Sequence, residues 1–407
     1  MKKLLKITAI LLAVVLLIPV FAGCHEKDEI AYTIGEHKFT SAMYSCVLYI
    51  SASEARSKIS DYLTAKEQST EKINYKQYKF DAEGNVSETG TISYNDHVKT
   101  TAVNVLRQYA VLLDYMKAEN LKLDDDTNTT AKINAEYYWY AGCDYSTYQY
   151  YTAYGADISQ YFTPYSEFLE PNGVALSTYE YYLTLDYTYD FYFKHLYDEG
   201  GAKAVDKATL TEYMTKHYAL GDVISLTTAD SSGKDLSAED KAEVKANADA
   251  YAQRITNGES FADVYKAYED SLKTEEQKKE ESKNAESASD TASTDKTEEE
   301  KEYTPESYKT LFGDEESTSE SNLFPAVSAM SVGEVKVLED TEQKCYVVVV
   351  RRDITEQDYW LKTLKSSILY ALKQDEFNAD LDKAGSALTA TEDKHATRPF
   401  SVEDIKF

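Results

Sequence analysis

Hydrophobic and polar positions change period along the chain, and each period predicts a type of element. Val335 and Val337 alternate with Lys336, which is the period of a strand with one face exposed to solvent. Residues 345–350 form a short β-branched apolar run, too short for a helix and suited to a buried strand. Because two strands do not stand alone in water, this hairpin needs more sheet or a cover of helices.

The segment upstream of the hairpin supplies sheet and cover. Residues 222–228 alternate like a strand. The helix that follows has its apolar residues on one face, namely Val244, Ala248, Tyr251 and Ile255. Gly258 ends this helix, because glycine enters the left-handed region without strain, and residues 261–268 begin a second helix. The predicted order is therefore strand, helix, helix and hairpin.

Helical periods dominate the first half of the chain. Residues 30–40 predict two short strands, and residues 98–119 predict a strongly amphipathic helix. Residues 121–126 lead into another helix with acids at its positive end. Near the end, residues 355–385 predict a long helix whose apolar stripe also needs a partner face.

The beginning of the chain has the pattern of an export signal. Three lysines within the first six residues precede an apolar run over residues 7–22. This run is shorter than the about 20 apolar residues of a spanning helix. Cys24, after Ala22 and Gly23, resembles the lipidated cysteine of a lipobox, with residues 1–23 as the signal peptide. An ordinary signal peptide or an uncleaved anchor is the alternative, and each places the chain outside the cytoplasm.

Charge and composition exclude several classes of function. The net charge of −28 argues against nucleic acid, because phosphate binding needs clustered cations. Besides Cys24, the cysteines are Cys46, Cys143 and Cys345, whose odd number and wide spacing imply no disulfide framework. The six histidines are scattered, so we expect no metal or other cofactor. No catalytic triad, paired-acid motif or phosphate loop stands out.

Tyrosine is concentrated in the middle of the chain. Residues 137–197 contain seventeen tyrosines. We assign about two-thirds of them to the core. Because tyrosine is amphipathic and its hydroxyl needs a partner or water, the rest predict a half-wet groove. Such a surface suits adaptable contacts with unfolded chains, or stacking on sugars.

An acidic, low-complexity insert separates the two helices from the hairpin. Residues 273–302 are rich in Lys, Glu, Ser, Thr and Ala, and they bury too little apolar surface to fold alone. We expect a disordered insert over residues 273–321, within which residues 303–312 have the composition to dock.

The order of elements resembles the parvulin-type peptidyl-prolyl isomerase domain. The matching residues are Gly258, residues 261–264, Ala326 seven residues before Gly333, and Tyr346. Extracytoplasmic foldases of the PrsA and SurA type carry such a domain between an N-terminal helical region and a returning C-terminal helix.

This resemblance implies an α+β fold and a domain plan. A mostly helical N-terminal domain over residues 24–218 is completed by the C-terminal helix and tail, residues 354–407. The parvulin-like domain, a small antiparallel sheet covered by helices, spans residues 219–353 and is interrupted by the insert at 273–321.

The departures from the family bear on activity. Its two histidine positions align with Val223 and Val347, which cannot form hydrogen bonds through their side chains. Its Gly-Gly-Asp-Leu-Gly strand is absent from the sequence. The resemblance implies weak peptide binding by Leu323, Met330 and Tyr346, and no catalytic residue.

Three functions follow as competing predictions. The first is a lipid-anchored, extracytoplasmic chaperone or foldase-like protein that binds unfolded or secreted polypeptides and has an inactive parvulin domain. The second is an active peptidyl-prolyl isomerase of the same family. The third is a surface lipoprotein that binds a ligand such as carbohydrate, and it rests on the tyrosines alone. The expected partners are polypeptides and, through Cys24, the membrane.

Overall fold

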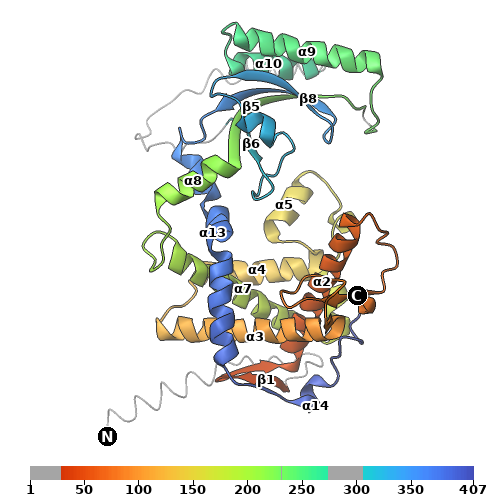
Figure 1. Cartoon of the computed structure of the whole chain (residues 1–407), viewed down its shortest axis with the longest axis vertical. Helices are drawn as coiled ribbons and strands as arrows, with labels where there is room; N and C mark the ends of the chain where they lie inside the picture. Colours follow the sequence, from red (N-terminus) through yellow and green to blue (C-terminus); the bar gives the residue numbers. More distant parts are fainter. Residues whose placement is uncertain (1–28, 231, 274–305) are drawn as a thin grey trace, which may run out of the picture. The chain divides into compact units, whose positions relative to one another are not determined.

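The computed structural model describes residues 29–230, 232–273 and 306–407 and shows an α+β fold (Figure 1). Two compact units divide it: residues up to 196 together with 375–407, and residues 197–374. Within the described residues, no helix combines the length and apolarity that crossing a membrane requires. Cys24 lies outside the described residues.

The first unit is mostly helical. Its α-helices are α2 (Ser41–Ala65), α3 (Tyr94–Ala118), α4 (Asp125–Ala141), α5 (Tyr145–Ala153), α6 (Tyr165–Leu169) and α7 (Leu176–Tyr197). Three short 3-10 helices join them, η1 (Tyr75–Gln77), η2 (Ile158–Gln160) and η3 (Glu170–Asn172). Side chains of Thr40, Ser93 and Asp124 accept hydrogen bonds from backbone N–H groups in the first turns of α2, α3 and α4. The expected helices therefore form, each begun by a polar cap.

Two small sheets complete the first unit. β1 (Ile30–Ile34), β2 (His37–Thr40) and β9 (Ala390–Glu392) form one in the order β2-β1-β9, and β3 (Lys79–Phe80) pairs with β4 (Ile92–Ser93). β9 is antiparallel to β1 and is followed by α14 (Lys394–Thr397). The C-terminal segment therefore shares a sheet and a core with the first strands and with α2 and α3.

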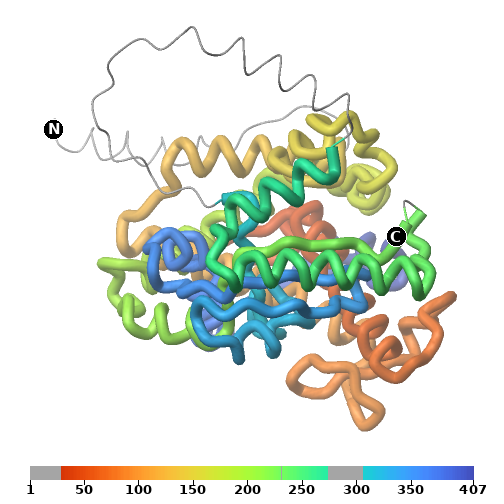
Figure 2. Tube along the Cα trace, turned by 90° about the horizontal axis from the view of Figure 1, so that it is seen from above, coloured from red at the N-terminus to blue at the C-terminus, as the bar shows by residue number. Residues whose placement is uncertain are grey.

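The second unit is built on a four-stranded antiparallel sheet in the order β6-β5-β8-β7. Its elements are α8 (Lys207–His217), β5 (Tyr218–Thr227), α9 (Ala238–Thr256), α10 (Phe261–Leu272), β6 (Lys309–Gly313), α12 (Phe324–Ser328), β7 (Val335–Asp340) and β8 (Cys345–Arg352). Figure 2 shows α9 running along the strands. The predicted order of strand, two helices and hairpin is confirmed.

The prediction of a disordered insert over residues 273–321 is wrong for its last part. Residues 309–313 form the edge strand β6, which pairs with Tyr218–Asp222 of β5. Phe312 is buried, and Gly221, which pairs with Thr310, leaves room for its ring: a Cβ at Gly221 would come within 3.2 Å of Phe312 and 2.7 Å of Val349. The docking expected of residues 303–312 is seen at residues 309–312, but the sequence did not show that it takes the form of a strand. Residues 274–305 lie outside the described part.

α13 (Asp358–Ala387) is the long helix predicted after the hairpin. From residue 375 onward it belongs to the first unit, where Phe377 is buried against Phe193 at a ring distance of 5.5 Å. The Tyr189 hydroxyl donates a hydrogen bond to Asn378 at 2.7 Å. This part of α13 thereby covers the apolar side of α7.

Candidate peptide-binding site

One face of the four-stranded sheet is covered by helices. Ile224 of β5 and Val348 and Val350 of β8 pack against Ala248 of α9 and against α10. Since successive side chains along a strand point to opposite faces, every second residue of β5 and β8 lies under this cover. This half of each strand contributes to the core and is closed to ligands.

The opposite face carries an apolar cluster with an open hollow. Val347 and Val349 pack there with Phe312 of β6. Leu323, which directly precedes α12, and Val327 of α12 complete the cluster. A cavity of about 440 Å³ opens on this face, and we call it the cup. Its lining residues are Val223, Ser225, Thr227, Thr310, Leu311, Phe312, Ser321, Leu323, Asp340, Gln343, Cys345 and Val347.

The structure separates the three predicted peptide-binding residues. Leu323 lines the cup. Met330, 5% exposed, packs in the same apolar cluster but does not line the cavity. Tyr346 packs against the cluster on the helix-covered face, because it alternates with Cys345 and Val347 along β8. Tyr346 and Leu323 therefore lie on different faces of the sheet, and the peptide-binding role of Tyr346 stays a prediction.

Val223 and Val347, which align with the family's histidines, both line the cup. Val223 pairs with Val349 in the ladder between β5 and β8, and Val347 pairs with Ser225. The floor of the cup is thus aliphatic at the two positions where the resemblance would place hydrogen-bonding groups.

Polar residues that the sequence analysis missed form the rim of the cup. Ser225 and Thr227 are exposed on β5, and Thr310, Asp340 and Gln343 contribute from its surroundings. The available signal was the alternation of β5, which places Ser225 and Thr227 on the same face as Val223.

Asp340 is the buried acid of this rim. Its Oδ1 accepts hydrogen bonds from Asn322 Nδ2 at 3.0 Å and from the backbone nitrogens of Glu342 and Gln343 at 3.0 and 2.9 Å. These bonds hold the turn between β7 and β8. The pKa of the neighbouring Cys345 thiol is raised by burial and by the charge of Asp340, so this thiol stays protonated at neutral pH.

A second hollow, of about 930 Å³, adjoins the cup and shares Ser321, Asp340 and Gln343 with it. No lysine or arginine is among its lining residues, and Phe324 and Pro325 add apolar surface. Six carboxylates line it: Asp314, Glu315, Glu316, Glu320, Asp340 and Glu342. The cup therefore continues into an acidic surface. Within the described residues, no three His, Cys, Asp or Glu side chains are placed to hold a metal ion.

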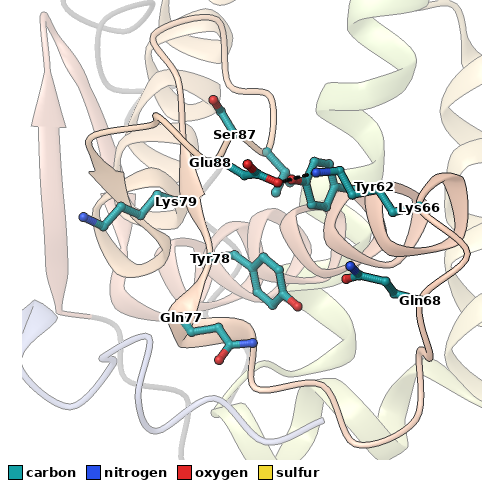
Figure 3. Close-up of a pocket in the computed structure, with 9 residues that line it drawn as sticks. Tyr62, Lys66, Gln68, Gln77, Tyr78, Lys79, Ser87 and Glu88 are labelled. Carbon is teal, nitrogen blue, oxygen red and sulfur yellow. Dashed lines mark hydrogen bonds and ion pairs between the residues drawn. The ribbon is translucent and has the colours of Figure 1, made fainter.

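A hollow in the first unit, of about 430 Å³, lies between the end of α2 and the β3–β4 excursion (Figure 3). Lys66 forms an ion pair with Glu88 and stands 4.5 Å from the ring centre of Tyr62. The Tyr62 hydroxyl donates to Glu88 at 3.2 Å. Figure 3 shows Tyr78 and Gln77 away from this pair. Because Lys66 and Glu88 inside it already form an ion pair, this hollow is a weaker candidate than the cup.

No protein-family model matches the sequence, and no curated protein matches it. Among solved structures, the chain is similar to PrsA from Bacillus subtilis, with 14% identity, TM-score 0.29 and coverage of 77% of this chain and 96% of that one. Foldase protein PrsA from Streptococcus pneumoniae shows 17% identity, TM-score 0.29 and coverage of 77% and 97%. Foldase protein PrsA from Lactococcus lactis shows 14% identity, TM-score 0.33 and coverage of 76% and 90%. No residue role carries over at this level of likeness.

Proposed function

We propose that this chain is a chaperone-like protein that binds extended segments of unfolded polypeptides in the cup. The observation that carries the proposal is the unequal use of the two sheet faces. One face is closed by α9 and α10, and the other presents an aliphatic floor with a polar rim. Apolar pockets with a few polar groups are the usual form of a site for small apolar groups.

The cup suits binding without catalysis. Rotation about a prolyl bond is accelerated only by contacts that are stronger in the twisted state than in the planar one. Val223 and Val347 offer no hydrogen bond, and the Oδ1 atom of Asp340 is engaged in the β7–β8 turn. Such a floor holds an apolar side chain equally in both states, so we assign the cup no isomerase activity.

We further propose that the chain acts outside the cytoplasm, held at a membrane by lipid on Cys24. The lysine-led apolar run over residues 7–22 and the Ala-Gly-Cys sequence at its end support this proposal. A protein placed there meets polypeptides in extended form as they are exported.

The test is peptide binding by the chain carrying Cys24→Ser, with Ser225→Trp as the variant. Ser225 is exposed on the rim, so the indole fills the cup without displacing a core residue. We expect the affinity for an extended apolar peptide to fall at least fivefold. Ala246→Trp, exposed on α9 over the other face, is the matched control and should leave affinity unchanged. Equal affinity of both variants and the parent would reject the cup as the site.

A further inference from the structure

A long part of the first unit contains no basic side chain. Lys132 and Lys194 are separated by 61 residues without lysine, arginine or histidine. The same stretch holds eight carboxylates: Glu136, Asp144, Asp157, Glu167, Glu170, Glu180, Asp186 and Asp190. This stretch therefore carries a net negative charge, although Asp190 forms an ion pair at 2.8 Å with Lys194, just beyond its end.

Within this stretch, four tyrosines form a connected cluster of rings on α5 and the segment after it. Tyr150 lies 5.6 Å from Tyr151 and 5.0 Å from Tyr154, and Tyr151 lies 5.0 Å from Tyr161, all between ring centres. Tyr150, Tyr154 and Tyr161 are 62%, 77% and 59% exposed. We call these four residues the tyrosine surface; Figure 1 labels α5, which carries Tyr150 and Tyr151 and is followed directly by Tyr154.

The tyrosine surface is not part of the core. The core of this region is made by another set of rings, in which Trp139 and Tyr165 pack against Tyr179. α5 itself has no buried residue and is held at its start by Asp144, which accepts a hydrogen bond from Thr147 N at 2.9 Å. Folding therefore does not account for three large rings that stand more than half exposed.

The chemistry of the surface selects a cationic occupant. Aromatic faces attract lysine and arginine through the ring quadrupole, and arginine also stacks on the ring. Within the described residues, no lysine or arginine of the chain lies over these four rings. Hydrogen bonds from Ser146 and Thr147 lower the pKa of Asp144 to about 2, and bonds from Ser159 lower the pKa of Asp157. Both carboxylates, which cap α5 and η2 in the segment that carries the rings, are therefore ionised at neutral pH.

We propose that the tyrosine surface binds arginine- or lysine-bearing segments of extended polypeptides. Charge complementarity favours this occupant over an anionic polymer, which the surrounding carboxylates would repel. The site is independent of the cup, so it stands or falls separately from peptide binding there.

The experiment measures binding of three flexible Gly/Ser 15-mers that carry four Arg, four Gln or four Glu. The protein is the full chain with Cys24→Ser. We expect the Arg peptide to bind at least tenfold more tightly than the Gln peptide, and the Glu peptide not to bind. Affinity for the Arg peptide should fall as salt is raised, because exposed charges are screened. Equal affinity for the Arg and Gln peptides would overturn the proposal.

Variants locate the site. Changing Tyr150, Tyr154 and Tyr161 together to Ser should lower the affinity for the Arg peptide about five- to thirtyfold. This is the loss expected when two exposed cation–ring contacts disappear. Changing the same three to Phe keeps the rings and should preserve binding. Tyr140→Ser, at a tyrosine that is 68% exposed on α4 and outside the cluster, is the matched control. Circular dichroism checks that all variants fold.

Three further results would also overturn the proposal. The triple Ser variant could bind the Arg peptide as the parent does, which would move binding to the acidic hollow beside the cup. A neutral oligosaccharide could bind and be lost in the same variant, which would make the occupant a sugar. Self-association of the parent that the triple Ser variant abolishes would make the occupant a second copy of this chain.

Discussion

At the scale of the residue, Asp222 joins three strands of the second unit through charge. Its side chain is 3% exposed, and its Oδ1 accepts from Lys309 Nζ on β6 at 3.0 Å. Its Oδ2 accepts from Arg352 on β8, with Nε at 2.7 Å and Nη2 at 2.6 Å. This carboxylate fastens the edge strand β6 to the centre of the sheet.

Asp222→Ala should destabilise the second unit by about 3–5 kcal/mol, because it leaves two cations without their buried partner. Chemical denaturation measures the loss. Asp358→Ala breaks an ion pair with Lys207 whose side chains are both 70% exposed, and should leave the midpoint unchanged. Equal effects of the two substitutions would show that burial of Asp222 contributes nothing.

The three cysteines of the described part should react slowly in the native protein. Burial raises the pKa of the thiols of Cys46, Cys143 and Cys345. A raised pKa means less thiolate at a given pH, and the thiolate is the reactive form. At pH 8, labelling by a disulfide reagent should be slow for all three and should become fast on unfolding. Rapid native labelling of Cys345 would show that the cup does not hold its thiol in the protonated form.

At the scale of the element, β6 is the strand that the sequence analysis did not predict. Its five residues follow a long acidic segment, yet Phe312 is buried against the sheet and pairs in register with Ala219. Phe312→Ala should cost about 3–5 kcal/mol of unfolding free energy.

Deleting residues 274–302 should leave the melting temperature nearly unchanged. The segment has no aromatic residue to bury, and halving a loop changes closure entropy by only about 0.6 kcal/mol. The deletion and the Phe312→Ala substitution are checked in one series of thermal unfolding measurements. A large drop in melting temperature after the deletion, or no drop after Phe312→Ala, would contradict the account in which β6 stabilises the fold and residues 274–302 do not.

Sequence periods predicted the strands and helices where one face is consistently apolar. Val335 and Val337 mark β7, and the stripe of residues 98–119 marks α3. The periods did not show which sheet face stays open, because β8 is apolar on both sides. The sequence analysis therefore named Tyr346 together with Leu323, which lies on the other face, and missed the polar rim at Ser225. The alternation of β5 placed Ser225 on the face of Val223, but which face stays open depends on strand partners and helices that are distant in sequence.

At the scale of the whole molecule, attachment to a membrane depends on one residue in this account. Replacing Cys24 by Ser should release the protein from the membrane fraction, and mass spectrometry of the parent should find diacylglycerol on Cys24. A single acyl chain holds a protein at a membrane only marginally, so we expect at least two acyl chains on Cys24. A mature N-terminus at another residue would contradict the lipid anchor.

We propose that the cup binds unfolded polypeptide without isomerising prolyl bonds. The most direct measurement is the refolding of a test protein limited by proline isomerisation, whose barrier is about 18–20 kcal/mol, with stoichiometric amounts of this chain. We predict that refolding slows as the unfolded test protein is held, and that Ser225→Trp abolishes this slowing while Ala246→Trp retains it. A refolding rate that rises with the concentration of the chain, and falls back with Ser225→Trp, would contradict the account and show an active isomerase.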